Sequence, residues 1–391
     1  MSVATGLDRL ARGDDEVVRL VRGRRVGLLA HPASVDRSLR HASAILTASG
    51  ADVRAFFGPE HGYGGEAQDM IGVEDASATG GVPVYSLYGS TLEALSPRPE
   101  WLDGLDALVV DLADVGSRYY TFVWTCALAM RACAAKGVQT IVLDRPNPLG
   151  GVRIEGAPQR PGYRSFVGLY DVPVRHGMSI GELARMAREL EGLDPACLEV
   201  VRAEGWSRAM EHDATGLPWV LPSPNMPTLD TAIVYPGGCL IEGTNLSEGR
   251  GTTRPFEIFG APFVDGHALA RDVVIEGATL RPLTFSPTFH KHAKTLCGGV
   301  QVHVTERARF SPYAAYLRLI AAIARRAREQ FAWRRDAYEF VTDRPAIDLL
   351  TGGPEAREAI DEGRDLGEVL AREAEGARAF ADRRGAWLLY A

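Results

Sequence analysis

A glutamate and a histidine, Glu60 and His61, directly follow an apolar stretch with the length and composition of a buried strand. Pro59 restricts the backbone on one side, and Gly62 lets a ligand approach closely on the other. A carboxyl group partly buried in such a turn suits general-acid catalysis, with His61 beside it as a second catalytic candidate. The alternative is structural: Glu60 caps the next segment, and His61 packs in the turn.

A second group of polar residues begins where another apolar stretch ends, at Asp111. Asp111 and Asp114 would place a second catalytic carboxylate in the same cleft as Glu60. Arg118 and Tyr120 would bind substrate, with the tyrosine ring as a platform for a sugar. In the structural alternative, Asp114 caps a helix and Arg118 neutralises Asp111.

Two further loops carry groups suited to holding a ligand. Asn147 lies in the run Asp-Arg-Pro-Asn-Pro, where it could bond a hydroxyl or an amide, or hold its own backbone in a tight turn. Arg175 and His176 precede a helix that Ser179 is predicted to cap, with Glu182 completing a capping box. A cation beside a helix N-terminus favours an anion site.

The densest polar stretch covers residues 242–254. Two carboxylates, two arginines, an amide and four hydroxyls fall within these 13 residues, with glycines between them. Solvated loops rarely combine so many glycines with so many ligand groups, and arginines here would suit a substrate carboxylate. We therefore interpret the stretch as a binding loop. Together with an amide from a proline-rich run upstream, the candidate substrate-binding residues are Asn225, Glu242, Asn245, Glu248, Arg250 and Arg254.

Several common chemistries have no motif in the sequence. It contains no GxGxxG fingerprint, no Walker lysine, no HExxH and no GxSxG, so we expect neither a cofactor nor a metal. A net charge of −7 argues against a nucleic-acid partner. No apolar run reaches the roughly 18 residues that would cross a membrane. Five cysteines without a CxxC pair, and no signal-peptide pattern, predict a cytoplasmic protein.

The hydrophobic pattern of the first half predicts the scaffold for these groups. Short apolar strands alternate with helices, which is typical of a mostly parallel sheet covered on both faces. In such sheets, ligands bind beyond the carboxyl ends of the strands. The polar groups that contain Glu60, Asp111 and Asn147 each begin at such an end. Strands are expected at residues 25–30, 52–57, 82–87, 107–112, 139–144 and 198–202, and helices at 34–49, 121–136 and 179–191.

The second half of the chain has a different pattern. Residues 217–264 are dense in Gly, Pro, Asn and Thr and are expected to be mostly loops. Beyond them we expect a helix near 266–274, strands near 281–285 and 299–305, a helix over 312–331, two short charged helices and a final strand. The predicted fold is α/β: a mostly parallel sheet domain over residues 1–225, then a smaller α+β C-terminal domain over residues 226–391.

Seven motifs occur in order over most of the chain: FFGPEHG (56–62), PVYSLYG (83–89), DLADVGSRYYT (111–121), LDRPNPLGG (143–151), RHGMSIGELA (175–184), LPSPNMPTLDTA (221–232) and EGTNLSEGRGTTRPFE (242–257). Together they resemble the NamZ-type exo-β-N-acetylmuramidases. The resemblance implies a glycoside hydrolase of cell-wall recycling that releases N-acetylmuramic acid from the non-reducing end of peptidoglycan fragments. Many members are exported, whereas this chain is expected to act inside the cell on imported muropeptides or disaccharides.

The resemblance also implies that the first domain is a Rossmann-like catalytic domain and that the active site lies in the cleft between the two domains. It suggests roles for the candidate residues as well. The family's PEHG glutamate falls on Glu60, which is expected to be the acid. The second group is expected to be Asp111, Asp114, Glu242 or Glu248, unless the substrate's acetamido oxygen attacks; retaining, inverting and substrate-assisted routes all stay open. An amide for the acetamido group is available from Asn225 or Asn245. The lactyl carboxylate calls for an arginine, with candidates Arg250, Arg254, Arg175 and Arg118.

Two other hypotheses belong to different classes of protein. One is a metal-dependent hydrolase that uses Glu60, His61 and Asp111. The other is a muropeptide-binding protein that keeps the cleft without the chemistry. The sequence predicts no oligomeric state.

Overall fold

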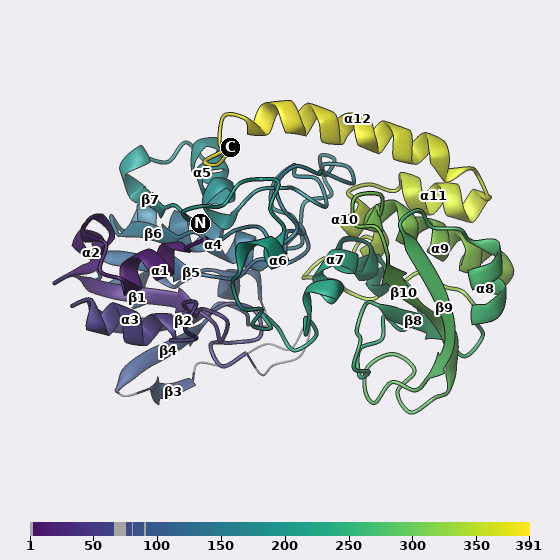
Figure 1. The fold of residues 1–391 in the computed structure, drawn as a ribbon, viewed down its shortest axis with the longest axis horizontal. Helices are drawn as coiled ribbons and strands as arrows, with labels where there is room; N and C mark the ends of the chain where they lie inside the picture. Colours follow the sequence, from purple (N-terminus) through teal and green to yellow (C-terminus); the bar gives the residue numbers. More distant parts are fainter. Residues whose placement is uncertain (1–2, 66–75, 80, 90) are drawn as a thin grey trace.

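The computed structural model describes residues 3–65, 76–79, 81–89 and 91–391. Its first half is built on a seven-stranded sheet in the order β3-β4-β2-β1-β5-β6-β7 (Figure 1). Six strands run parallel, and β3 pairs antiparallel with β4 at one edge. The strands are β1 (Arg25–Ala30), β2 (Asp52–Gly58), β3 (Ala76–Thr79), β4 (Val82–Ser86), β5 (Ala107–Asp111), β6 (Gln139–Leu143) and β7 (Leu198–Val201).

Helices cover both faces of this sheet, because the central strands are apolar on both sides. In β1, Leu28 belongs to one buried cluster and its neighbour Leu29 to another. The Leu28 face is covered by α1 (Gly6–Ala11), α2 (Asp15–Val21) and α3 (Ala42–Ala48), and the Leu29 face by α4 (Phe122–Ala135) and α5 (Ile180–Leu190). The α5 capping box between Ser179 and Glu182 is present as predicted.

One predicted helix of the first half is shorter than expected. The helix expected over residues 34–49 begins only at Ala42. The Asp36 carboxylate accepts hydrogen bonds from the backbone N–H groups of Ser38 and Arg40, which stabilise a turn instead. Leu39, expected on the helix's apolar face, has φ 61° and is 60% exposed.

The second half is a smaller α+β unit, so the predicted fold class is confirmed. It holds an antiparallel sheet in the order β8-β10-β9. Its strands are β8 (Ile258–Ala261), β9 (Ala278–Phe285) and β10 (Cys297–Val304), and its helices are α7 (Leu229–Gly238), α8 (Gly266–Asp272), α9 (Pro312–Arg326), α10 (Ala346–Thr351), α11 (Glu355–Glu362) and α12 (Leu366–Arg384). Short helices fill the connections: η1 (Leu92–Leu95), η2 (Pro99–Leu102), η3 (Pro195–Cys197), α6 (His212–Thr215) and η4 (Cys239–Gly243).

The interpretation of residues 217–264 as mostly loops missed α7, η4 and β8. Thr228 caps α7 by accepting from the Thr231 N–H. Pro236 and Gly237, which suggested a loop, lie inside this helix. A side chain at Gly237 would collide with the Pro312 carbonyl of α9, so the glycine permits close helix packing.

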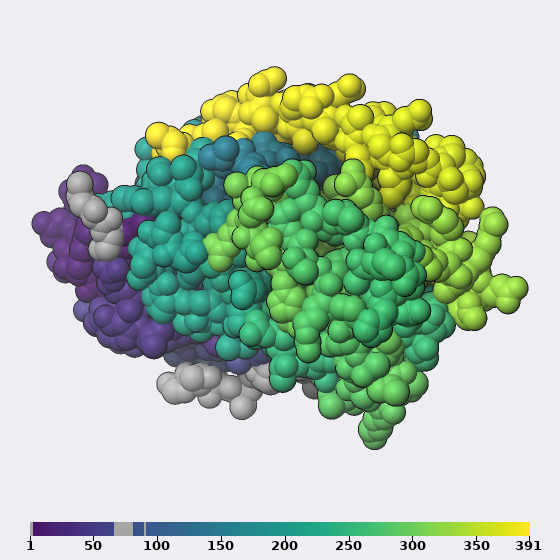
Figure 2. Space-filling model, turned by 45° about the vertical axis from the view of Figure 1, so that its right-hand side comes forward, coloured from purple at the N-terminus to yellow at the C-terminus, as the bar shows by residue number. Residues whose placement is uncertain are grey.

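The C-terminal prediction was wrong in length and type. In place of two short helices and a strand there are α10, α11 and the 19-residue α12, followed by an irregular tail. Figures 1 and 2 show α12 lying along one side of the molecule, from the second unit back to the first. The end of the chain therefore packs on the sheet domain where α5 begins.

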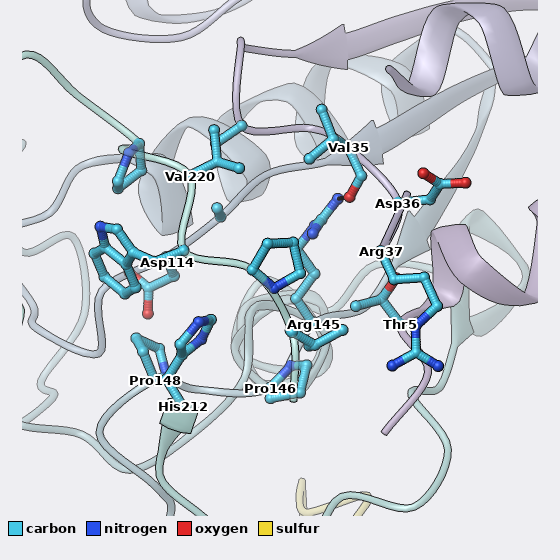
Figure 3. Close-up of a pocket in the computed structure, with 16 residues that line it drawn as sticks. Thr5, Val35, Asp36, Arg37, Asp114, Arg145, Pro146, Pro148, His212 and Val220 are labelled. Atoms are coloured by element: carbon cyan, nitrogen blue, oxygen red, sulfur yellow. Dashed lines mark hydrogen bonds between the residues drawn. The ribbon is translucent and has the colours of Figure 1, made fainter. Parts of the chain in front are cut away.

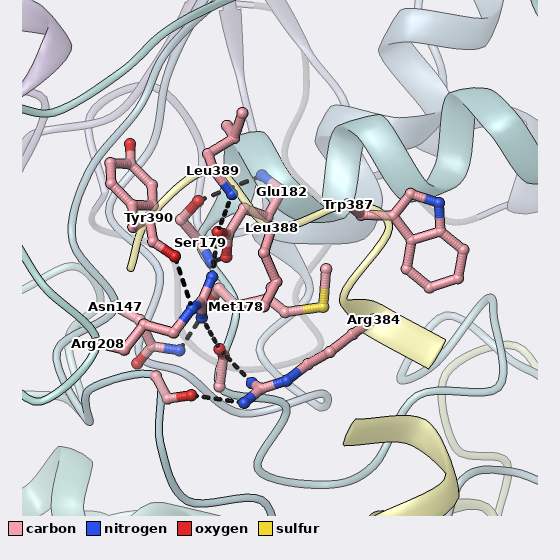
Figure 4. A network of polar contacts seen from close by, with 12 residues as sticks. Asn147, Met178, Ser179, Glu182, Arg208, Arg384, Trp387, Leu388, Leu389 and Tyr390 are labelled. Atoms are coloured by element: carbon pink, nitrogen blue, oxygen red, sulfur yellow. Dashed lines mark hydrogen bonds and ion pairs between the residues drawn. The ribbon is translucent and has the colours of Figure 1, made fainter. Parts of the chain in front are cut away.

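Hydrogen bonds fix this tail in place (Figure 4). Arg384 donates to the carbonyls of Gly151 (2.8 Å), His176 (3.1 Å) and Gly177 (2.6 Å). The Leu389 N–H donates to Glu182, and the Tyr390 hydroxyl to Asp144 (2.7 and 2.6 Å). These bonds tie the C-terminal end of α12 and the tail to the sheet domain. The division at residues 225 and 226 stays a prediction.

Candidate functional site

Glu60 lies at the carboxyl end of β2, in a tight turn that its neighbours impose. A side chain at Gly58 would collide with the backbone of Tyr63, and the Gly62 N–H closes the turn on the Pro59 carbonyl at 2.9 Å. His61 has φ 72°, a strained conformation for a residue with a side chain. Such strain is found preferentially at functional sites. Glu60 and His61 are both buried.

The Glu60 carboxylate is oriented by Thr121, at the start of α4. The Thr121 hydroxyl donates to Glu60 Oε2 at 2.6 Å. Thr121 occupies the N-cap position of α4, but its hydroxyl makes no capping bond to the helix. The Thr121 hydroxyl therefore bonds Glu60 instead of capping the helix. This bond connects the start of α4 to the end of β2.

Glu60 and His61 line a cavity between the two halves of the chain, with a volume of about 460 Å³ that includes space open to solvent. Much of its wall is aromatic. The Tyr235 ring lies edge-on to those of Tyr119, Tyr120 and Phe256, with centroids 4.8–6.3 Å apart. Burial raises the pKa of Tyr120 and Tyr235 well above the usual value, so both are neutral hydroxyls at physiological pH. Neutral aromatic walls with a few polar groups suit a sugar ring.

Across the cavity, the second unit contributes a charged pair. Arg250 Nη2 lies 2.7 Å from Glu242 Oε1, and the Tyr338 hydroxyl donates to Glu242 Oε2 at 2.8 Å. The Arg250 guanidinium also covers the Phe256 ring, 5.2 Å from its centroid. All four residues line the cavity, so the binding-loop interpretation of residues 242–254 fits Glu242 and Arg250.

Glu248, also predicted as a ligand residue, lies behind this pair and anchors it. It is fully buried and forms ion pairs with Arg250 (3.2 Å) and Lys291 (3.0 Å), and one of its oxygens lies 2.8 Å from His290 Nδ1. Burial alone would raise the pKa of Glu248, but the three basic groups outweigh it and hold the pKa well below its usual range. Glu248 is therefore a permanent anion that fixes the Arg250 side chain.

Sequence reasoning missed a third carboxylate in the cavity wall, that of Glu339. It is buried, and Tyr88 donates to it at 3.2 Å. Glu339 and the following Phe340 have φ of 45° and 68°. No glycine or proline marks this segment, so the sequence carries no signal for its strained turn. The other lining residues that were not predicted are Tyr119, Thr121, Phe122, Val167, Ser223, Met226, Tyr235, Phe256 and Tyr338.

The structure brings six of the predicted site residues to one cavity: Glu60, His61, Tyr120, Asn225, Glu242 and Arg250. Asp111 is not among them. It is fully buried, and Arg145 bonds both of its carboxylate oxygens, at 2.6 and 2.7 Å. The alternative in which Arg118 neutralises Asp111 is wrong, since Arg145 does so. His61 and Asp111 therefore do not form one metal site, and the described residues contain no group of three potential metal ligands.

Arg118, Asn147 and Arg175 hold backbone in place. Arg118 is buried and donates to the carbonyls of Ala157 and Val172, both at 2.9 Å, and to a carbonyl of α10. Asn147 accepts from Leu149 N and donates to a carbonyl at 2.9 Å, which is the tight-turn alternative. Arg175 pairs with a glutamate at 3.0 Å and with a loop carbonyl.

The predicted anion site at the start of α5 is filled by the protein itself. Asp144 accepts from the Gly181 N–H and from the Ser179 hydroxyl.

His176 is buried, and its Nε2 lies 3.5 Å from Asp114. Asp114 accepts from Gly116 N at 2.9 Å, so it caps a turn and not a helix.

Asn245 and Arg254 also lie outside the cavity wall. The Asn245 amide bonds the backbone of Gln330 and Ala332, at 2.7 and 3.0 Å, and so joins two loops. Arg254 is half exposed and lies 3.5 Å from Glu257. Each of these residues shapes the fold around the cavity rather than its surface.

Comparisons with known proteins identify the family of the chain. Residues 26–230 match the family described as exo-beta-N-acetylmuramidase NamZ, N-terminal, and residues 233–390 match its C-terminal counterpart. The chain is 43% identical over 395 residues to the peptidoglycan beta-N-acetylmuramidase NamZ of Bacillus subtilis (strain 168), covering 99% of this chain and 91% of that protein.

Two solved structures of DUF1343 family proteins from Bacteroides fragilis NCTC 9343 share the fold. One has a TM-score of 0.89 and 30% identity, and the other a TM-score of 0.73 and 27% identity. Each alignment covers 100% of this chain and 99% of the other chain. With both halves matched by one family over nearly the whole length, the chain belongs to the NamZ family of exo-β-N-acetylmuramidases.

Proposed function

We propose that this protein is an exo-acting glycoside hydrolase that releases N-acetylmuramic acid from the non-reducing end of peptidoglycan fragments. The observation that carries the proposal is the position of Glu60. It is buried at the end of β2, held by Thr121, and it lines one cavity with Arg250 of the second unit. A carboxyl group and a cation in a single aromatic-walled cavity match the two distinctive parts of the substrate, its glycosidic bond and its lactyl carboxylate.

In this proposal Glu60 protonates the leaving oxygen, as the acid of a glycosidase does. Arg250 is the candidate for the lactyl carboxylate, because it is the arginine in the cavity wall among the four predicted. Asn225 is the candidate for the acetamido group. Tyr120 supplies a neutral platform beside them.

The second catalytic group is proposed to be Glu242. Of the four carboxylates predicted for this role, it is the one that lines the cavity with Glu60. Arg250 contacts one of its oxygens and the Tyr338 hydroxyl donates to the other, which orients the side chain as a nucleophile or a base that activates water requires. The anomer first released, read by NMR, distinguishes retention from inversion.

We also propose that the enzyme works in the cytoplasm, in cell-wall recycling, on muropeptides or disaccharides. Its five cysteines are all free thiols, as expected for a reducing compartment. No helix among the described residues has the length and apolar character to cross a bilayer. Fractionation of cells into cytoplasm, membrane and medium tests this location.

Release of chromophore from a chromogenic N-acetylmuramide tests the activity. Wild type should turn it over with EDTA present, Glu60→Gln should lose the activity, and Glu199→Gln, on the exposed face of β7, should retain it. No turnover by wild type would refute the proposal. Equal rates for wild type and Glu60→Gln would remove Glu60 from the chemistry. Tight binding without turnover would favour the muropeptide-binding alternative.

A further inference from the structure

The connection between β9 and β10, residues 286–296, packs behind the binding loop of residues 242–254. The Thr288 N–H donates to the Gly251 carbonyl at 3.1 Å. A side chain at Gly251 would collide with the backbone of Thr288, so the two loops are in close contact. The described wall of the catalytic cavity contains none of residues 286–296. This hairpin loop can therefore influence the cavity only through the residues it contacts.

The hairpin loop has an unusual backbone. His290, His292 and Lys294 all have positive φ, between 56° and 66°, although none of them is glycine. This conformation is strained for residues with side chains. It accompanies two close contacts with the binding loop: His290 Nδ1 lies 2.8 Å from the Glu248 carboxylate, and His292 Nε2 lies 2.7 Å from the Asn245 carbonyl oxygen. The strain is thus found where the hairpin loop holds the binding loop.

Between the two histidines, the Lys291 ammonium group lies in a cage of four oxygen atoms. Its Nζ is 3.1 Å from the carbonyl oxygens of Ile241 and Leu246. The Glu242 carbonyl oxygen and Glu248 Oε2 lie 3.5 and 3.0 Å away. An ammonium group directs three N–H donors from one atom, whereas a guanidinium is a flat fork. Four oxygens around one point therefore suit a lysine better than an arginine.

Lysine is rare in this chain. Three of its 43 basic residues are lysines and the rest are arginines, so a lysine at position 291 calls for a reason. The other two have simpler surroundings: Lys136 pairs with an exposed aspartate, and Lys294 is itself exposed. Only at Lys291 does one nitrogen meet several backbone carbonyls and a buried carboxylate. The oxygen cage supplies the reason.

The Lys291 contact reaches the cavity through Glu248. Lys291 bonds Glu248 Oε2, and Oε1 of the same carboxylate lies 3.2 Å from Arg250 Nε. Another buried arginine is held differently: Arg145, in the wall of a second cavity (Figure 3), bonds both oxygens of Asp111 by itself. Glu248 instead divides its two oxygens among three basic groups. The direction of the Arg250 guanidinium therefore depends on Lys291.

We infer that Lys291 is a positioning residue of the catalytic cavity: through Glu248, it holds Arg250 where the guanidinium meets the lactyl carboxylate of the substrate. The inference rests on the proposed function, which supplies that carboxylate. Lys291 does not touch the sugar. Its loss should therefore weaken recognition of a sugar that carries the lactyl group more than recognition of one that lacks it.

The test is the ratio of kcat/KM for a chromogenic N-acetylmuramide to that for the matching N-acetylglucosaminide, which has no lactyl group. Lys291→Met keeps a long side chain without the charge and should lower this ratio about tenfold, as expected when a binding group is misplaced. Lys291→Arg should lower it as well, because a guanidinium does not fit the cage. Lys294→Met, the same exchange at an exposed position of the same loop, should leave the ratio unchanged. A wild-type ratio in Lys291→Met would overturn the inference.

A double substitution tests whether Lys291 acts through Arg250. If it does, adding Lys291→Met to Arg250→Lys should lower the ratio little further, because both changes disturb the same contact. A loss in the double variant equal to the product of the two single losses would show that Lys291 acts by another route.

Ammonium ions test the oxygen cage itself. The Lys291 side chain is 18% exposed, so a small ion can enter the space that Lys291→Ala leaves. Ammonium chloride should restore part of the lost preference in this variant. Tetramethylammonium chloride at the same concentration, whose cation has no N–H donor, should not. Equal ratios in the two salts would contradict the cage.

Calorimetric titration with free N-acetylmuramic acid separates this inference from the proposed function. If wild type cleaves neither sugar but binds N-acetylmuramic acid, with a Kd about tenfold higher in Lys291→Met and unchanged in Lys294→Met, the proposed function is wrong and the positioning role stands. If wild type is active and Lys291→Met keeps both its ratio and its Kd, the positioning role is wrong and the proposed function stands.

Discussion

Replacing Asp111 with asparagine should destabilise the protein while leaving the groups of the catalytic cavity in place. Asp111 ends β5, is fully buried, and both of its oxygens bond Arg145 at 2.6 and 2.7 Å. The substitution keeps the side-chain shape and one acceptor but leaves the Arg145 charge buried without a counter-charge.

The expected size of the effect follows from that burial. Removing one partner of a buried ion pair costs about 3–5 kcal/mol, and the acceptor that asparagine keeps places this variant near 3 kcal/mol. For a unit of roughly 200 residues this corresponds to a thermal midpoint about 6–12 °C lower. A control lies at the other end of the same strand, where Asp106 pairs with Arg25 in an exposed position. Asp106→Asn should change the midpoint much less, because solvent screens that pair.

Calorimetry of both variants, together with kcat for the chromogenic N-acetylmuramide well below the midpoint, measures the two effects separately. We expect Asp111→Asn to unfold early yet retain most of its kcat, and Asp106→Asn to resemble wild type in both. The opposite pattern, an unchanged midpoint with turnover abolished, would refute the structural assignment and return Asp111 to the catalytic candidates.

Three further predictions concern other contacts. Thr121→Val should reduce kcat about 10- to 100-fold, because Glu60 loses the hydrogen bond that orients its carboxyl group, whereas Thr121→Ser should keep most of the rate; equal losses would show that the hydroxyl does not matter. Arg250→Lys should reduce the preference for an N-acetylmuramide over an N-acetylglucosaminide by a similar factor in kcat/KM, and an unchanged preference would exclude Arg250 as the lactyl ligand. Burial raises the pKa of Asp144 to about 6 from 3.8, so between these values the native state holds a proton that the unfolded state has lost, and stability falls as pH rises. The thermal midpoint of wild type relative to Asp144→Asn should therefore drop from pH 4 to pH 7 by the equivalent of roughly 2.4 kcal/mol, and a constant difference would contradict the assignment.

The parallel sheet was predictable because its strands are short apolar runs that end in polar loops. All six parallel strands were placed, and Glu60 was found from its position at the end of one of them. The start of α3 was not predictable in the same way. The Asp36 carboxylate stabilises a local turn there, in competition with the helix that the apolar pattern suggests.

The wider candidate site was only partly predictable, because residue type does not reveal which partner a polar group finds. Arg118 and Arg250 look equally suited to a carboxylate in the sequence. In the fold, the Arg118 guanidinium donates its hydrogen bonds to backbone carbonyls. Arg250 lines the cavity instead and pairs with the buried Glu248. Glu339 was not predicted, because long-range packing, and not a local motif, brings residues 338–340 to the cavity.

The tail that follows α12 has a consequence for how the chain folds as it is made. Glu182 and Asp144 are buried in the first unit, yet two of their donors, Leu389 N and the Tyr390 hydroxyl, lie 207 and 246 residues further along the chain, beyond the second unit. Domains usually complete their folding in order from the N-terminus during synthesis. Here the first unit completes its hydrogen bonds only after the second unit has been synthesised, so the two units cannot finish folding independently of each other.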